Sequence, residues 1–410
     1  MIGDTFKNVF RSETQDFADR LNRNGGLCAK VAQALSLEDY DKKVFEMTNP
    51  VNPKATKAIK EQYVQRLQDE NVDLTVEPEA SWFGSVGQVY RGLLFDEAAS
   101  KDINVVLKVK YAGIESMVDK DMYLLHKGLK VYSKDMYVKY KTVVHEVTHC
   151  IQNELNFKRE AENVVRMSRL FASDSRYVTP TYLRGQFSED GDVLLTTQIM
   201  GERLNHWLEQ QPSQEKKNQV ATLIFTFVYT LLNCYNIIYP DSHWTNFLVI
   251  ESSKGLQLGI VDFGSVIYLP SDFRRCRQQF HSSLVEKDFG QFKRACLDLD
   301  LCNVDTHHDH IKQMFEYFLC QSQPLREDQF KFSSDYLGSC KKLPVESAKE
   351  MNSRSHLYGM IRSSHAVYTM MCVLEAEGHF KAIYEDTEAF SLSQEALQRK
   401  QDALDSAVIL

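Results

Sequence analysis

The stretch from Tyr239 to Gly264, YPDSHWTNFLVIESSKGLQLGIVDFG, constrains the fold of this chain more than any other. Asp241 and Asn246 stand in a D-x-x-x-x-N spacing that is typical of a loop, and Asp262 opens a D-F-G sequence after a short apolar run. Two carboxylates and one amide, converging from a loop and a strand end, are the hard oxygen ligands that Mg²⁺ prefers in proteins. The stretch therefore predicts a divalent-metal site.

Such a pattern is typical of phosphoryl-transfer sites, in which Asp and Asn hold the metal and a second Asp faces the acceptor group. We therefore expect Asn246 and Asp262 to ligate Mg²⁺, and Asp241 to act as a catalytic base. A complete site for ATP also needs a lysine that pairs with phosphate and an acidic residue that holds this lysine.

The candidate lysine is Lys108, inside the apolar sequence VVLKV. A lone lysine in a strand is usually solvated, but this one follows a small-residue turn and precedes the metal stretch. Its expected partner is Glu160, in the helix-like sequence ELNFKREAEN, for which a solvated helix face is the alternative. The turn before Lys108 is expected to bring backbone N–H groups close to phosphate, and it comprises Gly84, Ser85, Val86, Gly87 and Gln88.

Composition excludes several other classes of protein. The chain has 410 residues, enough for two or three domains or one bilobal enzyme, and a net charge of −8 without a strong basic patch, so we expect no nucleic acid partner. Its nine scattered cysteines, with no C-x-x-C pair, fit reduced thiols inside a cell. No signal peptide or transit peptide is evident, and the sequence leaves the compartment open.

Two segments raise the question of a membrane. Residues Val220 to Tyr239 approach the length and apolarity of a membrane span, but they contain polar residues and run straight into Asp241, so we predict a buried core helix. An N-terminal amphipathic face that includes Phe6, Val9 and Phe10 is compatible with contact to a membrane surface, although a packed helix is the preferred interpretation.

A zinc site is the alternative use of the histidines. His145 to His149 fits H-E-x-x-H, which on a helix places two histidines on one face with Glu146 as a base. No third histidine follows at a suitable spacing, so we prefer a structural role for this segment.

Hydrophobic periodicity divides the chain into three parts. Residues 1–76 are expected to form a helical extension, residues 77–200 a small lobe of strands with helices, and residues 201–410 a mainly helical lobe with the metal stretch. We expect Met200 to Glu202 to connect the two lobes. The predicted fold class is α+β, a bilobal protein-kinase-like fold with an N-terminal helical extension, and ATP is expected between the lobes.

These residues in this order resemble the UbiB family of atypical kinases, the aarF-domain or ADCK-like proteins. The family has a K-x-G-Q helix ahead of the kinase lobes, and Lys30 and Gln33 match its first and last positions. The family's V-A-V-K matches Val105 to Lys108, and its E-x-D matches Glu154 and Asn156. The resemblance implies a regulatory extension that carries Lys30, Gln33, Glu154 and Asn156.

Three departures from the family pattern bear on function. Ala32 replaces the glycine of K-x-G-Q, Asn156 replaces the aspartate of E-x-D, and Gly84 and Gly87 stand where family members carry alanine. The departures bear on nucleotide preference and on the family's restraint of protein phosphorylation. They leave Lys108 and the metal residues intact.

The resemblance implies an Mg²⁺-dependent ATP-binding protein that supports coenzyme Q biosynthesis, as an ATPase or as a phosphotransferase for a small or lipid-like molecule. Two alternatives stay open. Gly84 and Gly87 favour a protein kinase that phosphorylates Ser or Thr, and Ala32 and Asn156 favour a nucleotide-binding scaffold without turnover.

Overall fold

A computed structural model of the chain describes residues 53–84, 86–97, 100–120, 123, 152–183, 191–253, 255–339, 347 and 355–406. They fall into two compact units. Unit 1 lies within Met1–Val165 and Pro180–Gln198, and unit 2 lies within Arg166–Thr179 and Ile199–Ile409. The domain boundaries after residues 76 and 200 stay predictions.

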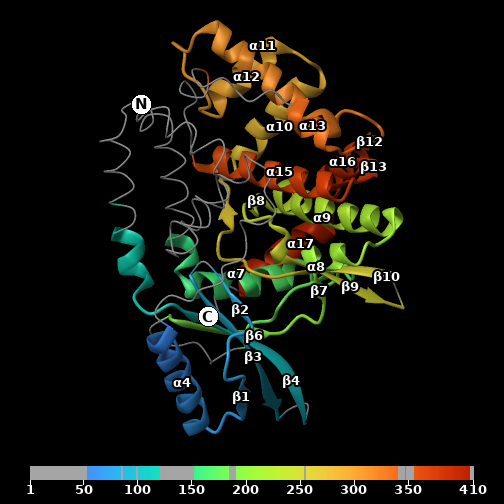
Figure 1. The fold of residues 1–410 in the computed structure, drawn as a ribbon. Coiled ribbons are helices and arrows are strands. Elements are labelled where there is room, and N and C mark those ends of the chain that lie inside the picture. Colours follow the sequence, from blue (N-terminus) through green and yellow to red (C-terminus); the bar gives the residue numbers. More distant parts are fainter. Residues whose placement is uncertain are drawn as a thin grey trace, which may run out of the picture. The chain divides into compact units, whose positions relative to one another are not determined.

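Unit 1 is built on a five-stranded antiparallel sheet in the order β1-β3-β4-β6, with β2 paired to β3 (Figure 1). The longest pairing runs from Gly87 opposite Lys110 to Asp96 opposite Lys101. The strands of this sheet are β1 (Leu74–Val76), β2 (Trp82–Phe83), β3 (Gly87–Asp96), β4 (Lys101–Lys110) and β6 (Val193–Thr197).

Helix α4 (Pro53–Asp69) covers one face of this sheet. Pro53 at its first position has the backbone angle that a helix start requires. Tyr63 and Leu67, one helical turn apart, are buried against the apolar residues of β1, β3, β4 and β6. Lys60 is also buried, because its ammonium group donates to the carbonyls of Glu77 at 3.2 Å and Pro78 at 3.0 Å.

Strand β4 separates the two faces of the sheet. Val105, Leu107 and Val109 are fully buried in the core that α4 covers. Because side chains alternate along a strand, Lys108 and Lys110 point to the opposite face. The apolar sequence VVLKV, which contains Lys108, lies within β4.

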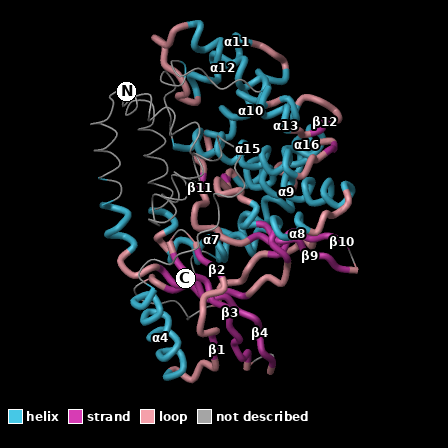
Figure 2. The backbone as a smooth tube through the Cα atoms, in the orientation of Figure 1, coloured by secondary structure: helices cyan, strands magenta, loops and turns pink. Residues whose placement is uncertain are grey.

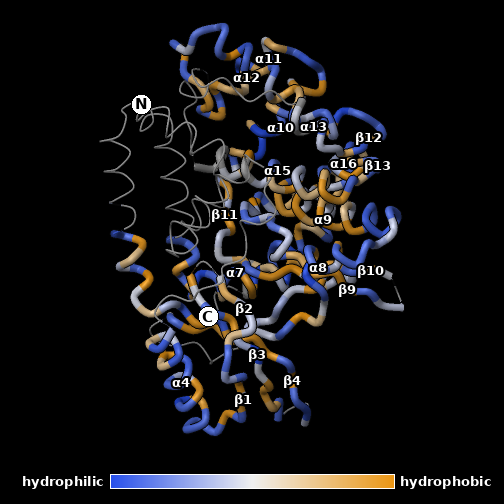
Figure 3. Tube along the Cα trace, in the orientation of Figure 1, coloured by the Kyte–Doolittle hydropathy of each residue, from blue (hydrophilic) through white to orange (hydrophobic). Residues whose placement is uncertain are grey.

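Unit 2 is mainly helical (Figure 2) and is organised around α9 (Gln214–Tyr235). Ser213 caps the start of α9 by accepting a hydrogen bond from the backbone N–H of Lys216. From Val220 onward most of its side chains are buried, and Figure 3 shows apolar residues along most of this helix with polar ones at one end. The predicted buried core helix is confirmed.

The apolar run of this segment does not stay helical to its end. Asn236 ends α9 in the left-handed conformation with φ of 56°, and the next two residues form β8 (Ile237–Ile238). Asparagine adopts this conformation at a lower cost than most residues, which explains why the helix ends there. Among the residues that the structure describes, no helix combines the length and apolarity needed to cross a membrane.

Helix α16 (Phe380–Phe390) packs along α9 through three contacts one turn apart. The rings of Phe225 and Phe380 lie 4.9 Å apart, and those of Tyr229 and Tyr384 lie 5.3 Å apart. Asn233 then donates from Nδ2 to Thr387 Oγ1 at 2.8 Å. This buried hydrogen bond fixes the register of the two helices.

A second sheet in unit 2, in the order β5-β10-β9-β7, contains the hairpin of β9 and β10. Its strands are β5 (Tyr177–Val178), β7 (Glu202–Arg203), β9 (Phe247–Ser252) and β10 (Gly255–Ile260). The segment from Tyr177 to Leu183 is divided, because Tyr177 and Val178 pair with β10 whereas Tyr182 bridges to Thr196 in unit 1.

The other elements of unit 2 are helices and short strands. They are α8 (Leu204–Glu209), η1 (Trp244–Asn246), β11 (Ile267–Tyr268), α10 (Phe273–Val285), α11 (Phe289–Asp298), α12 (His308–Gln321), η2 (Gln323–Leu325), β12 (Phe330–Lys331), α13 (Ser334–Ser339), α15 (Ser355–Val373), β13 (Glu377–Gly378) and α17 (Gln394–Ser406). Helix α7 (Phe157–Leu170) is shared between the two units.

Candidate functional site

Lys108 and Glu160 form a close ion pair within unit 1. The ammonium nitrogen of Lys108 lies 2.9 Å from Oε1 and 2.8 Å from Oε2 of Glu160. The carboxylate is almost fully buried, whereas 17% of the Lys108 side chain is exposed. A lysine held by both oxygens of a buried carboxylate keeps its positive charge at a fixed position, where it can attract an anion.

Local structure places both partners. Lys108 lies on the face of β4 away from α4, and Glu160 lies in the first turn of α7, where the helix dipole favours a negative charge. Phe157 begins α7 and is buried, and its ring lies 5.1 Å from the Lys108 ammonium and 5.6 Å from that of Lys110. Phe157 stands three residues before Glu160, but its residue type and spacing predict no role in the site.

Asn156 caps α7. Its side-chain oxygen accepts a hydrogen bond from the backbone N–H of Arg159 at 3.0 Å. Asparagine and aspartate cap a helix about equally well, so the change from the family's aspartate preserves the helix that carries Glu160. Glu154, also assigned to the regulatory set, is buried just before this helix.

In the turn before β3, the backbone is a better candidate for a phosphate contact than the side chains are. Val86 and Gln88 are both buried, and Gln88 accepts a hydrogen bond from the Tyr90 hydroxyl. Val89 pairs directly with Lys108, so Gln88 lies on the opposite face of the sheet. A contact of Gln88 with phosphate would therefore use its backbone.

Gly87 has a structural reason that is independent of any ligand. A Cβ atom at this position would lie 2.4 Å from the carbonyl oxygen of Val109 on β4. At Gly84 the nearest atom would be the carbonyl oxygen of Gly87, at 3.4 Å, which is an ordinary contact. Packing against β4 therefore requires a glycine at position 87, whereas packing does not require one at position 84.

Asp241 and Asn246 lie together in unit 2. Asn246 Nδ2 donates to the backbone oxygen of Asp241 at 3.0 Å and to its carboxylate Oδ2 at 3.3 Å. Both residues are largely buried. Because the NH₂ group of Asn246 is directed to Asp241, its amide oxygen is the atom that remains for a metal ion.

The hairpin brings Asp262 next to this loop. Ile260 pairs with Phe247, and the backbone N–H of Val261 donates to the carbonyl of Asn246 at 3.0 Å. Asp262 itself is left-handed, with φ of 67°, and its Oδ1 accepts a hydrogen bond from the N–H of Gly264 at 3.2 Å. The backbone thus joins the segments that carry the three predicted metal and base residues.

Tyr239 also belongs to this site, although its residue type predicts no such role. Its hydroxyl lies 2.9 Å from the carbonyl oxygen of Val261 and 3.0 Å from that of Asp262. Its own carbonyl accepts hydrogen bonds from Ser242 and Ser363, and its side chain is fully buried. In the sequence, only its position two residues before Asp241 indicates that Tyr239 belongs to the site.

The donor set of this loop suits Mg²⁺, because two carboxylates and an amide oxygen are hard ligands. In the described ranges, no three His, Cys, Asp or Glu side chains gather as a metal site made only of those residues would require. Lys30, Gln33 and Ser85, and the segment from His145 to His149, lie outside the described residues.

Comparisons with known proteins agree on one family. The model of the ABC1 atypical kinase-like domain matches residues 46–296. The atypical kinase COQ8, mitochondrial, of Schizosaccharomyces pombe is 24% identical over 73% of this chain and 50% of its own length. The probable protein kinase UbiB of Vibrio atlanticus is 24% identical over 65% of this chain and 48% of its own.

The protein ACTIVITY OF BC1 COMPLEX KINASE 3, chloroplastic, of Arabidopsis thaliana is 27% identical over 58% of this chain and 32% of its own length. The chain thus spans half or less of the length of these curated relatives.

Among solved structures, Rv3197 of Mycobacterium tuberculosis in complex with erythromycin has a TM-score of 0.61 and 18% identity, over 94% of this chain and 98% of that one. This likeness and the family match confirm the predicted α+β kinase-like fold.

Proposed function

The chain belongs to the family of ABC1 atypical kinase-like domains, and on that basis we propose that it binds Mg-ATP and acts as an ATPase or phosphorylates a small or lipid-like molecule. The observation that carries the proposal is the ion pair between Lys108 and the buried Glu160. A buried carboxylate that fixes a partly exposed lysine is what a phosphate-binding lysine requires.

The residues take the following roles in this proposal. Lys108 pairs with the nucleotide phosphates, and Glu160 and Phe157 hold its side chain in place. Asn246 and Asp262 hold Mg²⁺, which when bound would neutralise charge on the phosphate oxygens. Asp241 accepts the proton of the attacking hydroxyl or water, because its carboxylate is oriented by Asn246.

The choice of acceptor rests on the family. The resemblance to UbiB proteins connects the chain to coenzyme Q biosynthesis, which makes a quinone-related lipid a candidate acceptor beside water. Gly84 and Gly87 were the reason for the protein-kinase alternative. The close approach of the Gly87 backbone to Val109, however, explains this glycine without a ligand. Asn156 was one reason for the scaffold alternative. Because Asn156 still caps α7, this change does not by itself favour a scaffold.

Thermal unfolding with millimolar Mg-ATP tests nucleotide binding. We expect Mg-ATP to raise the melting temperature, and Asp262→Asn to abolish this increase, because the amide removes a charged metal ligand. The matched control is Asp272→Asn, an exposed aspartate ten residues later, which should keep the increase. If Mg-ATP does not raise the melting temperature of the protein without substitutions, the proposal is wrong.

Turnover of radiolabelled ATP tests the chemistry. Lys108→Met should lower phosphate release on the order of 100-fold, the usual cost of removing a charged group from the transition state. Lys101→Met, at the exposed start of the same strand, is the control. Free labelled phosphate without labelled protein supports an ATPase, whereas strong label on a co-incubated protein supports the protein-kinase alternative.

A further inference from the structure

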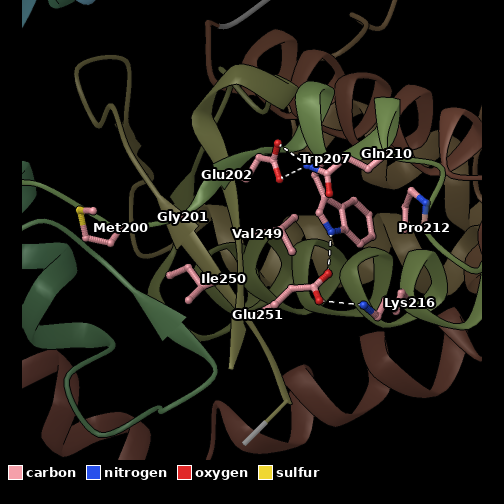
Figure 4. A pocket seen from close by; sticks show the side chains of 10 residues that line it. All are labelled: Met200, Gly201, Glu202, Trp207, Gln210, Pro212, Lys216, Val249, Ile250 and Glu251. Carbon is pink, nitrogen blue, oxygen red and sulfur yellow. Dashed lines mark hydrogen bonds and ion pairs between the residues drawn. The ribbon is translucent and has the colours of Figure 1, made fainter. Parts of the chain in front are cut away.

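A pocket of about 500 Å³ opens in unit 2. It lies between β7, β9, α8 and the start of α9 (Figure 4). Its size is within the range of pockets that bind small organic molecules or single side chains. Neither Lys108 and Glu160 nor the three metal and base residues line it.

Glu202 provides a fixed negative charge in this pocket. Gln210 Nε2 lies 2.7 Å from each carboxylate oxygen of Glu202 (Figure 4). This amide is a neutral donor, so it orients the carboxylate without cancelling its charge. Within the part of the chain that the structure describes, no cationic side chain forms an ion pair with Glu202.

The second acid of the pocket, Glu251, is already neutralised. Lys216 Nζ lies 2.7 Å from its Oε2, and the Trp207 indole nitrogen donates to its Oε1 at 2.9 Å. The hydrogen bonds from Lys216 and Trp207 lower the pKa of Glu251. Since Lys216 and Glu251 cancel one another, the pocket keeps one net negative charge, that of Glu202.

Apolar side chains complete the wall beside this charge. Met200 is 64% exposed, and Pro212, Val249 and Ile250 also line the pocket. An exposed thioether beside a pocket offers a flexible apolar contact to a ligand. One uncompensated carboxylate, an apolar wall and a small volume together fit a ligand with one positive charge on a short hydrocarbon chain.

We propose that this pocket binds an alkylguanidinium or alkylammonium group through Glu202. The group can belong to a free small molecule or to an Arg or Lys side chain of another polypeptide. The proposal does not rest on the function proposed above.

Fluorine NMR of the whole chain labelled with 5-fluorotryptophan tests the proposal. The chain has three tryptophans, Trp82, Trp207 and Trp244, and only Trp207 lines the pocket. Titration with butylguanidinium should shift the Trp207 resonance saturably and leave the other two unchanged, with Trp207→Phe giving the assignment. Butylurea, which has nearly the same shape without the charge, should bind at least about fivefold more weakly.

The carboxylate is tested with Glu202→Gln. This change should weaken butylguanidinium binding about fivefold or more, whereas Glu209→Gln, an exposed change in α8 outside the pocket lining, should leave it unchanged. The Trp82 and Trp244 resonances report in the same spectra that each variant is folded. Equal binding of butylurea, a Trp207 resonance that does not move, or unchanged affinity in Glu202→Gln would each overturn the proposal.

The source of the cation is decided with the peptide acetyl-Leu-Arg-Leu-amide and its citrulline analogue. Tighter binding of the arginine peptide than of butylguanidinium assigns the group to a polypeptide side chain. Weaker binding assigns it to a small molecule. A citrulline peptide that binds as well as the arginine peptide contradicts the required charge.

Discussion

At the scale of single residues, Tyr239 connects the two acidic positions of the candidate site. It precedes Asp241 by two residues, and its hydroxyl is within hydrogen-bond distance of the carbonyls of Val261 and Asp262. Asp262 has a positive φ, which costs a non-glycine residue of the order of 1 kcal/mol. The Tyr239 hydroxyl therefore helps to hold Asp262 in a conformation that the isolated backbone would disfavour.

Tyr239→Phe should lower the free energy of unfolding by about 1 to 2 kcal/mol, because two buried carbonyls lose their donor while ring packing is kept. It should also reduce the melting-temperature increase that Mg-ATP produces. Tyr229→Phe is the matched control, since its hydroxyl lies 3.1 Å from that of Tyr368, outside the candidate site. Urea titration measures stability, and an Mg-ATP response of Tyr239→Phe equal to that of the control would contradict this role.

Residue types and spacing predicted the partners Lys108 and Glu160, because a strand lysine and a helix acid have recognisable settings in the sequence. The role of Tyr239 could not be predicted in this way. Its hydroxyl meets carbonyls that lie 22 and 23 residues away, and backbone carbonyls carry no sequence signal.

At the scale of elements, the pairing of β3 and β4 decides where side chains of the site can point. It puts Lys108 and Val89 on one face and Gln88 on the other. The strands could be predicted from their alternation of apolar and polar residues. The face of the sheet on which Gln88 lies depends on the register of β3 and β4, which a single sequence specifies weakly at a glycine-containing turn.

The two glycines of the turn should respond differently to the same change. Gly87→Ala should lower the free energy of unfolding by about 1 to 3 kcal/mol, because the new methyl group meets the Val109 carbonyl on β4. Gly84→Ala should stay within about 0.5 kcal/mol, since its nearest contact is an ordinary one. Chemical denaturation of both variants measures the difference, and similar losses in the two would show that the close approach does not explain Gly87.

At the scale of the whole molecule, the two units have separate cores, and unit 2 contains a buried polar group between α10 and α16. Arg277 donates to Tyr384 and to Glu388, each at 2.9 Å, and the ring of His281 lies 4.3 Å from that of Tyr384. Burial, together with the charge of Arg277, lowers the pKa of His281 from 6.5 to about 4.

This shift makes the stability of unit 2 depend on pH. The unfolded chain binds a proton at His281 more readily than the folded chain, so the contribution is complete above pH 6.5 and decreases as the pH falls toward 4. We expect a loss of about 2 kcal/mol over this interval, discounted because the ring is not fully buried.

Urea unfolding at several pH values, followed by the fluorescence of Trp207 and Trp244, measures this loss. His281→Phe should flatten the dependence, and His206→Phe, at an exposed position of α8, should not. The same pH dependence in His281→Phe and the unchanged protein would contradict the assignment.

The packing of α16 along α9 has a consequence for how the protein is made. Asn233 and Thr387, which join the two helices, are 154 residues apart in the chain. At a synthesis rate of about 5 to 20 residues per second, the apolar side of α9 leaves the ribosome roughly 8 to 30 seconds before its partner. A newly made chain must therefore shield that surface through another route, such as a chaperone, until α16 has also been synthesised.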